Sequence, residues 1–178
     1  TNVYLINGLM ESTLNNLQKI NDLRVISRTS VEKYRHVPKS ITEMASELNV
    51  KYFVEGSGQK IDDRILLYIQ LIDAATDRHL WAKQYRRDAK DIFALQQEIA
   101  KDIAAEIEVI IAPEVKQRIE KIPTENLEAY DSFLKGVELL RKGTDENHLA
   151  AIVHFVDAIA KDNSFALAYA CAGIASYY

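Results

Sequence analysis

Apolar residues recur at three- and four-residue intervals in the first part of the chain, which is the spacing of one buried helical stripe. The stripe between Val3 and Ile20 consists of Leu5, Ile6, Leu9, Met10, Thr13, Leu14 and Leu17. Asn21 and Asp22 break this pattern, and the branched residues within Leu23–Ile26 are typical of a strand. The chain is therefore predicted to begin with a helix that leads into a short strand.

A second, shorter helix and three strands are predicted next. Ser40 is the expected N-cap of the helix, because Glu43 three positions later completes the capping-box spacing. Strands are predicted at 51–59, 65–73 and 79–87, the first from its alternating residues and the last from its two distinct faces. The middle segment is apolar on both faces, so we expect it at the centre of an antiparallel meander.

Small and acidic residues mark where this meander bends. Gly56 and Gly58 in the first strand would permit a bulge or the close approach of another backbone. Asp62 and Asp63 suit the tight turn that follows. The glycines do not form a phosphate loop, because the Gly-Lys-Ser/Thr ending and the helix after it are missing.

The rest of the chain has helical spacing. Asp91 can cap a long helix, whose buried side is predicted to consist of Ile92, Leu95, Ile99, Ile103, Ile107 and Ile110. Pro113 interrupts that helix or begins a second segment, because proline fits a first helical turn and damages an interior one. Residues 123–126 then form a joint, after which every segment is predicted to be helical.

Together these elements predict an α+β chain with two parts. Residues 1–121 are expected to form a small α/β domain with a mixed sheet, which ends in a long connector helix at 91–121. Residues 122–178 are expected to be all-helical. Because the chain starts without Met and both ends fall within amphipathic patterns, we expect it to be a piece of a longer protein.

Small and aromatic residues in the last part have the spacing of tetratricopeptide-type repeats. Ala151, Phe155 and Ala158 match the second helix of a repeat, and Tyr169 and Gly173 match the start of the next. Gly136 would be the equivalent of Gly173, at slightly more than the usual period of about 34 residues, and the turn at 142–148 would hold the excess. Small residues allow close helix approach, and the aromatic ring fills the groove between helices.

Three residues depart from the repeat pattern. Asn163 replaces the proline that usually separates repeats, Ser132 stands where a large aromatic residue is usual, and Ser176 takes a position often held by tyrosine. A coincidental pair of amphipathic helices therefore stays open as the alternative.

Composition narrows the function classes. The 178 residues include 22 Lys and Arg against 26 Asp and Glu, and this formal charge of -4 offers no broad cationic field for nucleic acid. No apolar run approaches the roughly 20 residues needed to cross a bilayer, and the first residues lack a signal-peptide pattern. The single cysteine, Cys171, is expected to act as a small hydrophobe on a packed helix face.

No catalytic or metal-binding constellation stands out, so we expect no cofactor, no metal and no catalytic residue. The four histidines, His36, His79, His148 and His154, are scattered and lack the spacing of a zinc site. The acidic pairs flank predicted elements, where turn and cap roles account for them better than acid–base chemistry.

One dense basic patch lies at the end of the meander. Lys83, Arg86 and Arg87 lie beside Tyr85 near the end of the last predicted strand. A solvated strand end is one interpretation of this patch, and docking of an acidic partner surface is the other.

Blocks along nearly the whole chain are similar to one bacterial arrangement. The segments NGLMESTLNNLQKINDLRVISRTS and DIFALQQEIAKDIA, and the later PTENLEAYDSFLKG, resemble a TolB amino-terminal-like domain followed by tetratricopeptide repeats. Such arrangements lie downstream of nucleotide cyclase domains, of serine/threonine kinase domains and of winged-helix regions in CadC-like regulators. The family's domain normally opens with a buried strand, and if it is missing before Thr1 an edge is left open that invites another chain.

The resemblance implies a non-catalytic regulatory module of a multidomain bacterial signalling protein, adenylate cyclase-like or transcription-regulator-like. Its expected partner is a protein or peptide bound in the helical groove, and a homo-oligomer is a further option. The alternative is a small-molecule sensor with its ligand near Gly56 and Gly58. Relatives of this arrangement occur both behind a membrane anchor and without one, so the compartment stays open.

Overall fold

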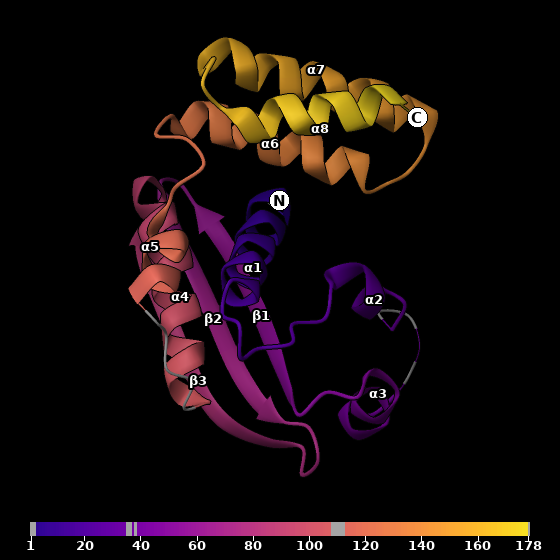
Figure 1. The fold of residues 1–178 in the computed structure, drawn as a ribbon, viewed down its shortest axis with the longest axis vertical. Coiled ribbons are helices and arrows are strands. Elements are labelled where there is room, and N and C mark those ends of the chain that lie inside the picture. The colour runs from indigo at the N-terminus through magenta and orange to yellow at the C-terminus, as the bar shows by residue number, and fades with distance from the viewer. Residues whose placement is uncertain (1–2, 35–36, 38, 108–112, 178) are drawn as a thin grey trace. The chain divides into compact units, whose positions relative to one another are not determined.

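The computed structural model of the protein describes residues 3–34, 37, 39–107 and 113–177 (Figure 1). The elements are, in chain order, α1 (Val3–Gln18), α2 (Arg28–Glu32), α3 (Ile41–Leu48), β1 (Tyr52–Ile61), β2 (Arg64–Asp73), β3 (Arg78–Asp88), the 3₁₀ helix η1 (Ala89–Asp91), α4 (Ile92–Glu106), α5 (Pro113–Glu120), α6 (Leu127–Leu140), α7 (Asp145–Lys161) and α8 (Ala166–Tyr177). The predicted α+β class is confirmed. The chain divides into two compact units, Thr1–Leu9 with Lys121–Tyr178 and Met10–Glu120.

The sheet of the second unit is an antiparallel meander in the order β1-β2-β3, so the prediction that β2 is central is confirmed. One face is buried through Ile65, Leu67, Ile69 and Leu71. The opposite face is partly open, since Tyr68 is 44% exposed. Helix α4 and the part of α1 around Met10 both lie on the buried face (Figure 1).

The strand predicted at Leu23–Ile26 is wrong, and with it the prediction of a mixed sheet. These residues lack regular structure, and Ser27 then caps α2 by accepting a hydrogen bond from the Ser30 amide. A strand exists only where a neighbouring strand pairs with it, and within the described residues none lies beside this segment. Branched residues alone could not create the strand.

The helix cap before the meander and the turn at Asp62 were predicted correctly, and the bulge in β1 was not. The capping box of Ser40 and Glu43 is present at α3, and Asp62 takes a positive φ of 53° in the predicted turn. The bulge predicted at the glycines is wrong, because the irregularity lies at Leu71 and Ile72, between β2 and β3. A Cβ on Gly56 would lie 2.6 Å from Met10 Sδ, so this glycine makes room for a side chain of α1 and not for another backbone.

The predicted long helix is described as two helices, with 108–112 and therefore Ile110 outside the described residues. Helix α4 buries the expected stripe through Ile92, Leu95, Ile99 and Ile103 against the sheet unit. Asp91 precedes α4 at the predicted cap position, but its side chain makes no capping hydrogen bond. Helix α5 starts at Pro113, which confirms the second of the two roles considered for this proline.

Three helices, α6, α7 and α8, lie side by side in the other unit (Figure 1). Asn126 caps α6 by accepting from the Glu128 and Ala129 amides, and Thr144 caps α7. The turn between α6 and α7 is short, with Gly143 at a φ of 68°. Asp145 already begins α7, so most of the residues assigned to a longer turn at 142–148 lengthen the helix instead.

Candidate functional site

Four of the six residues predicted to pack the repeat lie on the buried sides of α6 and α7. Gly136, Ala151, Phe155 and Ala158 are all buried. A Cβ on Gly136 would lie 2.6 Å from Cε1 of Phe155, so the missing side chain is what admits the aromatic ring. The aromatic ring of α7 therefore fills the space left by a glycine of α6.

An aromatic cluster surrounds this contact. The Phe133 ring has its centroid 5.8 Å from that of Phe155, 5.0 Å from that of Phe165 and 6.2 Å from that of Tyr130. Such tilted and offset pairs add to the free energy of burial. Sequence reasoning missed Phe133 and Phe165, although their aromatic character near the repeat positions was a usable signal.

Tyr169 and Gly173, the other two predicted residues, do not join the cluster. Tyr169 is 49% exposed, and a Cβ on Gly173 would meet nothing within 4 Å. They belong to a set of exposed α8 residues that we call the α8 surface: Leu167, Tyr169, Gly173, Ile174 and Tyr177. This helix is therefore apolar on sides that no described element covers.

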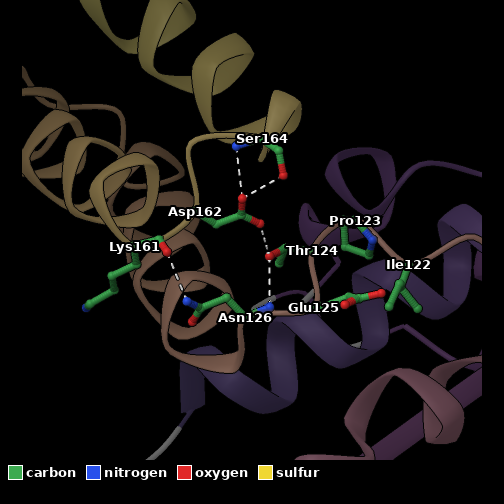
Figure 2. A pocket seen from close by; sticks show the side chains of 8 residues that line it. All are labelled: Ile122, Pro123, Thr124, Glu125, Asn126, Lys161, Asp162 and Ser164. Carbon is green, nitrogen blue, oxygen red and sulfur yellow. Dashed lines mark hydrogen bonds between the residues drawn. The ribbon is translucent and has the colours of Figure 1, made fainter.

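A polar joint links the start of α6 to the end of α7 (Figure 2). The hydroxyl of Thr124 donates to Asp162, which also accepts from the amide and hydroxyl of Ser164. Asn126 donates from its backbone to Thr124 and from its side chain to the Lys161 carbonyl at 3.0 Å. These hydrogen bonds lower the pKa of Asp162, with Ser164 as the larger cause and Thr124 the next.

An open hollow at this joint is lined by Ile122, Pro123, Thr124, Glu125, Asn126, Lys161, Asp162 and Ser164 (Figure 2). Thr124, Asn126, Asp162 and Ser164 bond to one another or to the neighbouring backbone, as capping groups do. The hollow therefore forms part of the connection between helices.

Ser132, which stands where repeats often have an aromatic residue, is buried in a polar cluster. Its hydroxyl donates to Asp157 and accepts from Lys161 Nζ at 2.9 Å. Lys161 also pairs with Asp157 at 2.6 Å, and the hydrogen bonds from Lys161 and Ser132 lower the pKa of the Asp157 carboxyl. Ser132 therefore takes part in hydrogen bonds that join α6 and α7.

The first turns of α1 belong to the same unit as these helices and contact α6. The Tyr4 hydroxyl donates to Asp131 at 2.8 Å, and Asn7 donates to Glu138 at 3.1 Å. A Cβ on Gly8 would lie 2.4 Å from a methyl of Leu134. Burial, followed by the hydrogen bond and charge of Asp131, raises the pKa of Tyr4 to about 12.

The structure divides the predicted basic patch between two faces of β3. Lys83 pairs with Asp102 at 2.6 Å and Arg87 with Glu98 at 2.8 Å, both on α4. The exposed Arg86 is paired with Leu66 in the strand register, on the opposite face.

Tyr85, the fourth residue of the patch, is buried and donates to Asp102 at 2.7 Å. Burial raises the pKa of Tyr85, and the hydrogen bond to Asp102 raises the pKa of Lys83. Lys83, Tyr85 and Arg87 therefore hold β3 against α4, and Arg86 is the member of the patch turned away from that helix.

Other candidate chemistry is sparse. Met10 fills the space beside Gly56, where the sensor alternative would place its ligand. Burial raises the pKa of the Cys171 thiol, in keeping with a packed rather than reactive cysteine. In residues 3–34, 37, 39–107 and 113–177, no cluster of three or more His, Cys, Asp or Glu could hold a metal ion. No helix in these ranges has the length and apolar character needed to cross a bilayer.

The fold and these contacts define a two-unit α+β module whose clearest candidate site is a helical packing surface. Residues 2–102 match the family described as HilA/YgeH-like transcriptional regulator, second domain, so the chain belongs to that family. The chain is also 34% identical over 132 residues to "Putative adenylate cyclase 3" of Rhizobium meliloti (strain 1021). That similarity covers 74% of this chain and 22% of the Rhizobium protein, so the chain spans about a fifth of its relative.

Proposed function

We propose that this chain is a non-catalytic regulatory module of a multidomain bacterial signalling protein, with an adenylate cyclase-like or transcription-regulator-like output elsewhere in that protein. The observation that carries the proposal is the pair of relatives, a transcriptional-regulator second domain and part of a protein named as a cyclase. DNA binding and nucleotide cyclisation have unrelated chemistry. A domain that occurs in proteins of both kinds is best explained by a regulatory step that acts before either activity.

The repeat is the proposed means of regulation. A TolB amino-terminal-like domain over 1–121 would adjoin tetratricopeptide-type helices over 122–178, whose groove binds a protein or peptide. The packing of Phe155 on Gly136 and the apolar α8 surface support this assignment. If an acidic protein surface docks on the sheet unit, Arg86 would be its main contact, because Lys83 and Arg87 already pair with carboxylates of α4.

The absence of catalysis is tested directly with the purified chain. Incubated with ATP and Mg²⁺ or Mn²⁺, it is expected to form no cyclic AMP. Formation of cyclic AMP that is abolished by a substitution within the chain would overturn the proposal.

Regulation is tested in the full-length protein that carries the chain, with its signal-dependent output as the readout. Ile174→Lys places a charge on the α8 surface, at a side chain that is exposed, so folding should persist. The matched control is Thr42→Lys, at an exposed position of α3. We expect the first variant to change the response to signal and leave the basal output intact, and the control to behave as wild type. An identical response in all three proteins would remove the regulatory assignment.

A further inference from the structure

The outer face of the sheet, opposite the face that packs on α4, carries an exposed aromatic ring on its central strand. Tyr68 of β2 is 44% exposed. Its register partners, Ser57 of β1 and Gln84 of β3, are exposed as well. Successive residues of a strand point to opposite faces, so this row lies on the side of the sheet away from the buried Leu67 and Ile69. Two polar neighbours therefore flank a ring that is available for contact.

Arg86 lies next to this ring. In the strand register it follows Gln84, the partner of Tyr68, by two positions, so it is the diagonal neighbour of Tyr68 on the same face. Diagonal neighbours are about 7–8 Å apart, which an aromatic and a long side chain can bridge. Arg86 is exposed and forms no ion pair within the described residues, whereas Arg87 is paired with a carboxylate of α4. The outer face thus presents a cation without an acidic partner beside a half-exposed ring.

The other charged groups of this face have partners or neighbours of complementary chemistry. Glu55 accepts a hydrogen bond from Gln70 at 2.9 Å. Arg64 lies opposite Asp88 in the register, at the end of the two strands. Arg86 therefore supplies the positive charge next to the ring, and an acidic group is the complement of that charge.

This surface belongs to the central strand β2 and to β3. A strand placed beside β1 would extend the sheet in its own plane, about 4.8 Å from β1, and would leave the faces of β2 and β3 as they are. The exposure of Tyr68 and Arg86 is therefore independent of what lies next to the outer edge of β1.

We propose that Tyr68 and Arg86 anchor an acidic segment of a partner protein on the outer face of the sheet. The tyrosine ring offers a large contact area at a low cost in side-chain entropy, and the guanidinium can hold a carboxylate through two hydrogen bonds. Tyrosine and arginine are also enriched among the residues that dominate protein interfaces. The proposal rests on the proposed regulatory function and adds to it a partner surface on the sheet unit.

Single-stranded nucleic acid is the competing occupant, because bases stack on exposed aromatic rings. Its backbone requires a positively charged groove, and the formal charge of -4 gives this chain no broad cationic field. One arginine beside one ring matches a carboxylate next to an apolar side chain better than a row of phosphates.

An NMR titration of the isotope-labelled chain with a short acidic peptide tests the proposal. The probe is acetyl-EEWEE-amide, and its matched control is acetyl-QQWQQ-amide, which keeps the ring and removes the charges. We expect saturable shifts of the amide signals of Leu66, Tyr68, Gln84 and Arg86 with the acidic peptide. The shifts should be much smaller with the neutral peptide, and added salt should weaken the binding of the acidic one.

Substitutions separate the two anchors from the general charge of the chain. Arg86→Gln should weaken binding about tenfold or more, because a hydrogen-bonded charge is lost. The matched control is Arg87→Gln, which removes the same charge from the adjacent residue on the opposite face and should bind like wild type. Tyr68→Thr should also weaken binding, and Gln84→Lys, which adds a cation beside the ring, should strengthen it. Circular dichroism should show each variant folded.

The proposal is overturned if neither peptide gives saturable shifts, if both bind equally well, or if Arg86→Gln binds like wild type. Shifts of the same signals by oligothymidylate, and not by the acidic peptide, would assign the surface to nucleic acid. A wild-type dimer that Arg86→Glu dissociates would assign it to a second copy of the chain. The regulatory function fails separately, because its readout is the output of the full-length protein, whereas peptide binding is measured on the chain alone.

Discussion

The ring of Phe155 occupies the space that any side chain on Gly136 would need. A Cβ there would lie 2.6 Å from Cε1 and 2.8 Å from Cδ1 of the ring, both inside contact distance. We predict that Gly136→Ala lowers the free energy of unfolding by about 1–3 kcal/mol through overpacking. Urea unfolding followed by circular dichroism measures this change.

Gly173 is the matched control, since it is the equivalent glycine in the proposed next repeat and has open space around it. Gly173→Ala should leave the free energy of unfolding unchanged or raise it by up to about 1 kcal/mol, because alanine favours a helix more than glycine does. Equal destabilisation by the two substitutions would show that packing on Phe155 is not what Gly136 provides.

Sequence reasoning located elements whose determinants lie close together in the chain. The capping box of Ser40 and Glu43 and the turn at Asp62 depend on residues within four positions, so their patterns suffice. The strand at Leu23–Ile26 failed for the opposite reason. Strand propensity reports the fit of a residue to a neighbouring strand, and in the described residues this segment has none.

The candidate site likewise combines features that the sequence pattern indicates with contacts that depend on tertiary packing. The small and aromatic residues at Gly136 and Phe155 drew attention to α6 and α7 from their sequence spacing, and the structure places the two residues in contact. Tyr4 and Asp131 are 127 positions apart, and no periodicity relates them. The alternation of β3 put Lys83 and Tyr85 on one face, but the choice of α4 carboxylates as their partners depends on tertiary packing.

The polar joint predicts a stability change at acidic pH. Asp162 accepts hydrogen bonds from Ser164 and Thr124, which hold its pKa below the ordinary value of 3.8. A lowered pKa in the folded state means that the stabilisation is complete above the unfolded-state pKa and is lost as pH falls through the folded-state pKa. Asp162→Asn should therefore destabilise the protein at neutral pH, and the difference from wild type should shrink below about pH 4.

Thermal unfolding of both proteins between neutral pH and pH 3 checks this expectation. Glu125→Gln is the control, because Glu125 is an exposed carboxylate at the same joint (Figure 2). It should have little effect at any of these pH values. A deficit in Asp162→Asn that persists unchanged at pH 3 would mean that the carboxylate charge is not the source of the stabilisation.

The contact of α1 with α6 predicts a late-ionising tyrosine. The pKa of Tyr4 is raised to about 12 by burial and then by Asp131, so the folded state favours the protonated hydroxyl. Its contribution to stability is complete below the ordinary tyrosine pKa of 10.0 and is lost as pH rises toward 12. Asp131→Asn should lower the pKa of Tyr4.

Tyrosinate absorbance as a function of pH, taken as the difference between wild type and Tyr4→Phe, isolates this group. The same difference in an Asp131→Asn background should show ionisation at lower pH. An unchanged midpoint in that background would mean that Asp131 does not interact with the hydroxyl in solution.

The two adjacent arginines of the basic patch, Arg86 and Arg87, are predicted to contribute differently to stability. Arg87 donates from Nη2 to both carboxylate oxygens of Glu98, at 3.0 and 2.8 Å, whereas Arg86 lies on the opposite face of β3. Arg87→Ala should lower the free energy of unfolding by about 0.5–1 kcal/mol at low salt, since the pair is partly exposed, and by less at high salt. Arg86→Ala should change it by less than about 0.5 kcal/mol, as surface substitutions usually do. Urea unfolding at two salt concentrations distinguishes the two variants. A larger or salt-sensitive loss in Arg86→Ala would contradict the assignment of Arg87, and not Arg86, to the contact between β3 and α4.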